Sequence, residues 1–385
     1  MTSILVFAAG AALLIYSAEK LITYLVGAAR GLAVSLFLLA ILFTGIEFDD
    51  LVFGVVLNLE GLEEVALGVI FGTVISLSGL VLAIAALIAP CRVEVPKDYI
   101  ALFAVAPLVL VVPALLGELG PVTAVVLILL FVLFVAYVAY RESRRAVPTF
   151  RSAEVLEQLD SRELATATAG KAGGGGGSGG HGAGDLYETG GVGRARSDGR
   201  PGWVLLLLAL LALAGLVLGA WAMTEGTEGI LENFAISGTV FGATIATLVL
   251  SVEDIFLTAE PARRGAPAIG VGNVIGSVVF SVTAKVGIIA LAGGALLITP
   301  DLFSWHLPAL VVINGFAAYA LFTGHLRRWH GVALLVGYVA YWVISFSVFG
   351  LVPVEEAEGP EEAQQPGVEA PAVPGAPDAP PADDD

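Results

Sequence analysis

The feature that most constrains this chain is a series of ten apolar runs, each long enough to cross a hydrocarbon core of about 30 Å. Hydrophobic residues make up 57% of the chain and charged residues only 14%, which is too little charge for the exterior of a water-soluble protein. The sequence therefore predicts an all-α integral membrane protein with ten transmembrane helices in two sets of five. The runs cover residues 1–28, 31–58, 64–89, 99–117 and 121–140, then 203–222, 230–258, 267–292, 302–322 and 330–351.

The segments outside these runs divide the chain into four parts. Residues 1–140 form the first five-helix repeat and residues 201–351 the second. Between them, 141–200 has GKAGGGGGSGGHGAGD at its centre, which is typical of a flexible linker rather than of a phosphate-binding loop. The tail, 352–385, is rich in Pro, Glu, Ala and Asp, so we expect it to be disordered. Much of the net charge of −17 comes from its ten acidic residues.

The positions of the basic residues predict how the chain is oriented. Sixteen of its eighteen Lys and Arg fall in alternate loops, nine of them in the linker. Because cytoplasmic loops carry the excess of Lys and Arg, we expect a cytoplasmic linker and both termini outside the cell membrane. No basic segment precedes the first run, which favours a spanning helix over a cleaved targeting peptide.

The two halves share a pattern at an offset of 204 residues. This shift places Asp49-Asp50 on Glu253-Asp254, Gly68 on Gly272, Gly72 on Gly276 and Thr73 on Ser277. An odd number of spans in each half requires that the halves insert in opposite directions. Inverted repeats with polar, glycine-interrupted helices in matching places are typical of transporters that bind their substrate near the bilayer midplane.

Several acids lie inside the predicted spans, where each ionisable group costs about 2.5–3.5 kcal/mol on insertion scales. The second run carries Glu47, Asp49 and Asp50, and the seventh carries Glu253 and Asp254. Adjacent residues of a regular helix point about 100° apart, which predicts that Asp49 and Asp50 face different ways. If Asp50 and Asp254 face each other from antiparallel helices, their oxygens form a cavity suited to Na⁺ or Ca²⁺. Alternatively, some of these acids lie at the membrane surface or in fixed ion pairs.

Small residues recur at four-residue spacing in the third and eighth runs. They are Gly68, Gly72 and Thr73, then Gly272, Gly276 and Ser277. Such faces serve close helix packing, and they also allow backbone and hydroxyl groups to approach an ion held by the next helix. Both roles are compatible.

Lys285, in GSVVFSVTAKVG (276–287), is the most unusual residue inside a span. A buried lysine commonly neutralises an acid, here Asp254, Glu253 or an acid of the second run. Alternatively, it occupies the space of a bound cation and alters the number of ions that the site holds.

These motifs resemble the alpha-repeats of sodium/calcium exchangers, in the Ca²⁺:cation antiporter superfamily. The second repeat contains GATIATLVLSVED (242–254) and GNVIGSVVFS (272–281), which keeps Asn273 of the family pattern. The first contains GIEFDDL (45–51) and GVIFGT (68–73), and both repeats have eighteen residues from the acid to the glycine. The resemblance implies Asp50 and Asp254 as the central ion-binding carboxylates. It adds, as further oxygen ligands, Ser251, Thr73, Ser277, Ser281, Glu47, Asp49 and Glu253.

The chain departs from the family pattern at several ligand positions. Ile46-Glu47 and Leu250-Ser251 stand where the family has Thr-Ser, and Asp49 and Glu253 replace its proline. Val69 replaces the partner of Asn273, and Leu77 replaces a polar residue. Hydroxyl and amide ligands are thus fewer, while extra acids and a lysine are present.

The resemblance implies a secondary active antiporter that exchanges Ca²⁺, or another divalent cation, for Na⁺ or H⁺ by alternating access. The alternative is a transport-inactive relative that acts as a membrane ion sensor or scaffold. We expect no enzyme activity and no cofactor, because no nucleophile–base pair or HExxH motif is present and Cys91 is the single cysteine. The expected partners are the lipid bilayer and inorganic cations, without nucleic acid.

Overall fold

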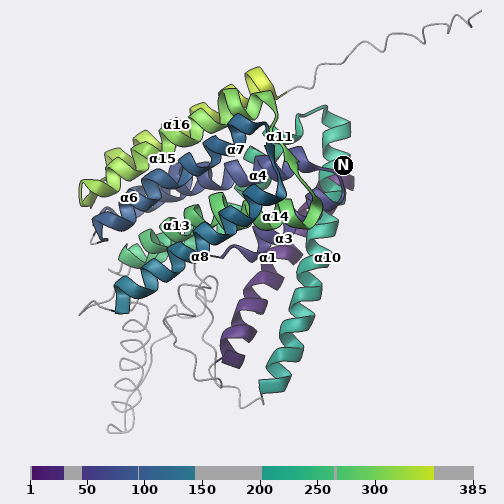
Figure 1. Cartoon of the computed structure of the whole chain (residues 1–385), viewed down its shortest axis with the longest axis horizontal. Helices are drawn as coiled ribbons and strands as arrows, with labels where there is room; N and C mark the ends of the chain where they lie inside the picture. The colour runs from purple at the N-terminus through teal and green to yellow at the C-terminus, as the bar shows by residue number, and fades with distance from the viewer. Residues whose placement is uncertain (1, 30–45, 94, 144–201, 264–266, 351–385) are drawn as a thin grey trace, which may run out of the picture. The chain divides into compact units, whose positions relative to one another are not determined.

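The computed structural model describes residues 2–29, 46–93, 95–143, 202–263 and 267–350 (Figure 1). The predicted tail, residues 144–200 of the predicted linker and residues 31–45 of the second run lie outside these residues. The first half contains α1 (Thr2–Ala29), α3 (Phe48–Leu59), α4 (Glu63–Ser76), the π-helical η1 (Leu77–Val81), α5 (Leu82–Ile88), β1 (Cys91–Arg92), α6 (Lys97–Val105), the 3₁₀ segment η2 (Ala106–Leu110), α7 (Val111–Leu116), β2 (Glu118–Leu119) and α8 (Pro121–Ser143).

The second half has the same order of its third to fifth spans and strands. It contains α10 (Gly202–Phe234), α11 (Gly238–Phe241), the π-helical η3 (Gly242–Ala246), α12 (Thr247–Arg263), α13 (Pro267–Phe280), the π-helical η4 (Ser281–Lys285), α14 (Val286–Gly293), β3 (Leu296–Leu297), the π-helical η5 (Leu302–His306), α15 (Leu307–Phe322), β4 (His325–Leu326), α16 (Arg328–Ile344) and the π-helical η6 (Ser345–Phe349).

Nine helices within the described residues are long and apolar enough to cross a membrane. Large apolar side chains such as Val122, Leu210 and Val336 are exposed on the outer faces of these helices, as lipid contact requires. The prediction of an all-α, multi-pass membrane protein is therefore confirmed. In the described part of the second predicted run, α3 begins at Phe48, and Ile46 and Glu47 before it are not helical.

The 204-residue offset also relates helices of the first half to helices of the second. Shifted by 204, the bounds of α4 coincide with those of α13, and the bounds of η1 with those of η4. The π-helical segments η1 and η4 therefore interrupt the third span of their halves at the same position. Such local π-helices are often found at functional sites.

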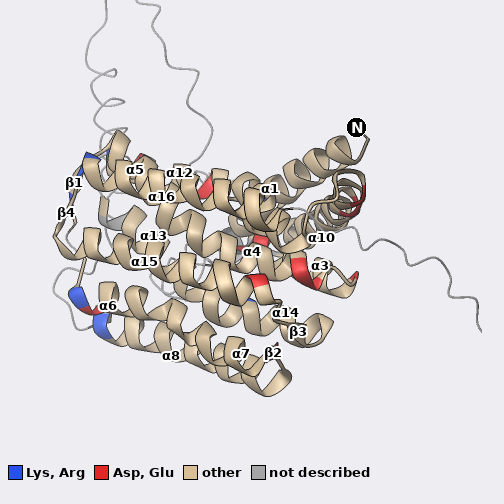
Figure 2. Ribbon diagram, turned by 90° about the horizontal axis from the view of Figure 1, so that it is seen from above, with Lys and Arg blue, Asp and Glu red and all other residues tan. Residues whose placement is uncertain are grey.

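Two short antiparallel strand pairs join loops from different halves. Cys91 and Arg92 of β1 pair with Leu326 and His325 of β4, while Glu118 and Leu119 of β2 pair with Leu297 and Leu296 of β3. Figure 2 shows that these pairs lie at opposite ends of the helices, and that Lys and Arg gather at the end with β1 and β4. Each half thus contributes one strand to each end.

The sixth span differs from its prediction. Residues 223–229 were expected to form a loop, but α10 continues through them to Phe234, and a left-handed Ala235 (φ 49°) follows. The glycines in this stretch pack against α1 rather than forming a turn: a Cβ at Gly226 would lie 2.4 Å from the backbone nitrogen of Phe7. The seventh span accordingly begins at Gly238 rather than at residue 230.

Glycines also bring α4 into close contact with α11 and η3. A Cβ at Gly68 would lie 2.3 Å from the carbonyl oxygen of Thr239, and a Cβ at Gly72 would lie 2.6 Å from Cα of Ala243. From the other side, a Cβ at Gly242 would lie 2.3 Å from the carbonyl oxygen of Val65. The small face of the third span therefore does serve close packing, and it holds α4 against the seventh span.

Candidate functional site

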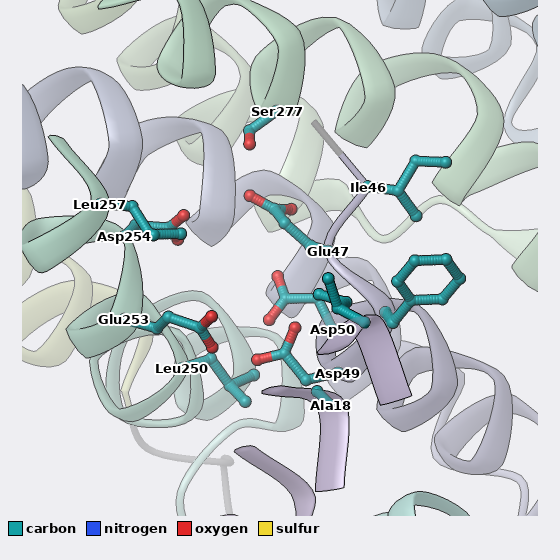
Figure 3. A pocket seen from close by; sticks show the side chains of 12 residues that line it. Ala18, Ile46, Glu47, Asp49, Asp50, Leu250, Glu253, Asp254, Leu257 and Ser277 are labelled. Carbon is teal, nitrogen blue, oxygen red and sulfur yellow. The ribbon is translucent and has the colours of Figure 1, made fainter. Parts of the chain in front are cut away.

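A pocket opens between the beginning of α3 and the middle of α12, the two elements that carry the repeated acid pairs. Its cavity volume is about 40 Å³. Five carboxylates line it, and Figure 3 shows those of α12 facing those that precede and begin α3 across the space. The lining residues are Ala18, Ile22, Ile46, Glu47, Phe48, Asp49, Asp50, Leu250, Glu253, Asp254, Leu257 and Ser277.

The start of α3 explains why three acids gather on one side of the pocket. Glu47 occupies the position before the helix, and Asp49 and Asp50 lie in its first turn. A helix N-terminus carries partial positive charge, which favours carboxylates there. Asp49 and Asp50 were expected to face different ways, yet both line the pocket, because they lie at the end of the helix that borders it.

Lys285 lies beside the pocket, at the end of η4, with 0% of its side chain exposed. Its ammonium nitrogen lies 2.9 Å from Oε2 of Glu47 and 2.8 Å from Oδ2 of Asp50. The sequence left open whether Lys285 pairs with an acid of the second or of the seventh span. In the structure its partners are the acids of the second span.

Two hydroxyl groups complete this arrangement. Thr73 Oγ1 lies 2.6 Å from Oδ2 of Asp50 and 3.3 Å from the Lys285 nitrogen, from which it accepts a hydrogen bond. Ser281 donates to Oε2 of Glu47 at 3.0 Å. We call these five residues the lysine cluster; they are Glu47, Asp50, Thr73, Ser281 and Lys285. Burying charges is costly without full pairing, and this cluster supplies that pairing for the ammonium.

Some buried polar atoms of the predicted site residues have no hydrogen-bond partner among the described residues. They include Oε1 of Glu47, Oγ of Ser277 and Nδ2 of Asn273. Glu47 and Ser277 line the pocket itself. A buried polar atom without a partner is costly, so two oxygens at this pocket would be stabilised by a cation.

Other predicted site residues lie outside the pocket lining. Ser251 is buried on α12, one turn before Asp254, and is outside the pocket lining. Gly272 and Gly276 lie on α13, where they correspond to the packing glycines of α4. In the described residues no three His, Cys, Asp or Glu side chains converge closely enough to hold a metal ion in this conformation. The five carboxylates line the same pocket, but no three of them converge on one metal position.

Sequence patterns assigned no site role to the first span, which the structure places at the pocket. Ala18 and Ile22 of α1 form part of its wall. Apolar residues on a spanning helix carry no chemical signal, so sequence patterns could not identify them. The glycine spacing of α1 and α10 was the available hint: a Cβ at Gly10 would lie 2.4 Å from the backbone nitrogen of Met223.

Comparisons with known proteins agree with this geometry. Over 140 residues the chain is 30% identical to "Sodium/calcium exchanger MaX1" of Methanosarcina acetivorans, covering 36% of this chain and 40% of that protein. It is 27% identical over 143 residues to "Putative antiporter CaxA" of Alkalimonas amylolytica, covering 36% of this chain and 44% of that protein. These matches thus span less than half of the curated relatives.

The fold is similar to that of a solved structure, the sodium-calcium exchanger NCX_Mj soaked with Na⁺ and Ca²⁺. The TM-score is 0.52 at 19% identity, and the likeness covers 91% of this chain and 99% of that one. The profile of the family described as "Sodium/calcium exchanger protein" matches residues 2–140 and 204–347. Since this match includes most of both helical halves and omits the predicted linker and tail, the chain belongs to the sodium/calcium exchanger protein family.

Proposed function

We propose that this protein is a secondary active antiporter that exchanges Ca²⁺, or another divalent cation, for Na⁺ or H⁺ across the cell membrane. The observation that carries the proposal is the pocket between α3 and α12, lined by five carboxylates from equivalent elements of the two halves. Hard cations such as Ca²⁺ and Na⁺ prefer carboxylate and hydroxyl oxygens. Members of the family are exchangers rather than enzymes.

The arrangement of the strands supports inverted repeats within a ten-helix fold. β1 and β3 both follow the third span of their halves, yet they lie at opposite ends of the helices (Figure 2). Opposite ends for equivalent loops are what an inverted repeat requires. The clustering of basic residues at one end supports a cytoplasmic linker with both termini outside.

In the proposed mechanism the competing cations share overlapping carboxylates. Asp254 and Asp50 are the central ligands, with Asp49, Glu253 and Ser277 at the same pocket and Ser251 close by. Occupied states move between outward and inward openings, because a pocket with several unneutralised acids is costly to close inside the membrane. Each ion shifts the equilibrium according to its own affinity for the two states.

The direct test is uptake of radiolabelled Ca²⁺ into proteoliposomes that contain the purified protein. Vesicles loaded with Na⁺ are compared with K⁺-loaded vesicles and with vesicles that carry a pH gradient. Uptake driven by the Na⁺ or pH gradient is expected, and it identifies the countercation. Absence of uptake under every gradient, with folded protein in the bilayer, would overturn the proposal.

The second candidate is a transport-inactive ion sensor. The observation that favours it is the lysine cluster, which engages two of the acids in ion pairs. Equilibrium binding of Ca²⁺ or Na⁺ without gradient-driven flux would select this function over antiport.

A further inference from the structure

The lysine cluster provides an ammonium group with a complete set of oxygen partners. A lysine ammonium has three donors, and its neighbours here are Oε2 of Glu47, Oδ2 of Asp50 and Oγ1 of Thr73. The distances of 2.9, 2.8 and 3.3 Å account for all three donors. This is a set of two carboxylates and one hydroxyl, the same kind of oxygen shell that a free monovalent cation would take.

Lys285 lies on a different helix from the two acids that it pairs with. Lys285 ends η4, whereas Glu47 and Asp50 flank the start of α3. Its side chain is fully buried, so the charge is held by the protein at a fixed place. Counted as formal charges, two acids and one ammonium give the cluster −1 beside the pocket.

We propose that Lys285 is a tethered cation that takes the place of one exchangeable monovalent cation at Glu47 and Asp50. This inference deepens the proposed function and rests on it, because it assumes that the pocket exchanges cations. The ammonium neutralises one negative charge permanently, so the protein binds one monovalent cation fewer than the same carboxylates would bind without it. Asp49, Glu253 and Asp254 have no such partner from Lys285. Together with Asp50, which belongs both to the lysine cluster and to the pocket lining, they form the part of the pocket that exchanges ions.

The test is to count bound Na⁺ per chain at equilibrium, with radiolabelled Na⁺ and purified protein in a choline buffer. Lys285→Met removes the ammonium and leaves both acids, so it is expected to bind one Na⁺ more than the wild type. The double variant Glu47→Gln with Lys285→Met removes one acid together with the ammonium. It keeps the charge of the wild-type cluster and is expected to return to the wild-type count.

Lys20→Met serves as the matched control, because Lys20 also lies within a span and pairs with Glu19 outside the lysine cluster. It is expected to leave the Na⁺ count unchanged. An unchanged count in folded Lys285→Met would overturn the inference. If Lys285→Met unfolds in choline, purification in Na⁺ is expected to restore it, since Na⁺ can fill the place of the ammonium; unfolding in both buffers would overturn the inference as well.

This experiment is independent of transport. A wild type without gradient-driven flux, combined with one additional Na⁺ in Lys285→Met, would overturn antiport and support the tethered cation. Flux in the wild type with an unchanged count in Lys285→Met would support antiport and overturn the tethered cation.

Discussion

Pro107 leaves a buried carbonyl without its helical donor, and Asn314 replaces that donor from another helix. Proline has no N–H, so residue 107 cannot bond to the carbonyl oxygen of Phe103, four residues earlier. Nδ2 of Asn314 lies 3.0 Å from that oxygen, and Oδ1 of the same side chain accepts from Ser78 at 2.9 Å. In a membrane no water can satisfy such groups, so one amide stabilises both.

We expect Asn314→Leu to lower the melting temperature of the purified protein in detergent. The change leaves the Phe103 carbonyl and the Ser78 hydroxyl without this partner, at a cost of about 1–3 kcal/mol for each buried unsatisfied group. Adding Pro107→Ala restores an N–H four residues after Phe103 and is expected to recover part of the loss. An unchanged melting temperature in Asn314→Leu would contradict this role.

Residue patterns predicted the acids of the pocket but not the partners of Lys285. Asp50 and Asp254 were found because their positions repeat at 204 residues within an apolar background. The partner of a lysine on another helix depends on helix rotation and on where each helix begins, which periodicity does not define. The sequence shows no turn signal that would predict the beginning of α3 at Phe48, because the second run is long enough to be one continuous helix.

At the scale of the elements, close helix contact depends on residues that lack a side chain. The α4 helix lies against α11 and η3 through Gly68, Gly72 and Gly242. The sequence predicted this face from its four-residue spacing, but it misread the glycines near residue 226 as a loop. Glycine followed by polar residues favours a turn in water, whereas here Thr227 is buried and Gly226 contacts α1.

Gly68→Ala is expected to destabilise the protein by about 1–3 kcal/mol, the usual cost of overpacking. The added Cβ would lie 2.3 Å from the carbonyl oxygen of Thr239, so two helix backbones must separate. The measurement is the melting temperature, with Gly315→Ala as the matched control. No atom lies within 4 Å of a Cβ at Gly315 among the described surroundings, so that variant should keep or slightly raise the melting temperature. Equal effects in the two variants would contradict the packing argument.

At the scale of the whole molecule, the described residues of the two halves interlock instead of forming separate domains. Each strand pair joins a loop of the first half to a loop of the second, and α1 lies beside α10 (Figure 1). The sequence predicted two sets of helices and their relation by offset. It could not predict this interlocking, because contacts between distant helices leave no periodic signal.

Cys91 offers a direct test of orientation, because it is the single cysteine of the sequence. It lies in the loop after the third span, which is expected to be cytoplasmic. A membrane-impermeant maleimide applied to intact cells should leave it unlabelled until the cells are permeabilised. Burial raises the pKa of the Cys91 thiol, so the thiolate is scarce at neutral pH and labelling should accelerate as the pH rises. Glu60→Cys in a Cys91→Ser background places a thiol at the other end and should react in intact cells. The reverse pattern would contradict the proposed topology.

The central claim is that the acid-lined pocket carries the exchanged ions, and flux through an Asp254→Asn variant tests it most directly. The asparagine side chain has the same size as that of Asp254 but lacks the charge that attracts a divalent cation. Gradient-driven Ca²⁺ uptake is expected to fall to the level of protein-free liposomes. Glu225→Gln, an exposed acid on α10, removes the same charge away from the pocket and should retain wild-type uptake. Wild-type uptake in folded Asp254→Asn would contradict the account.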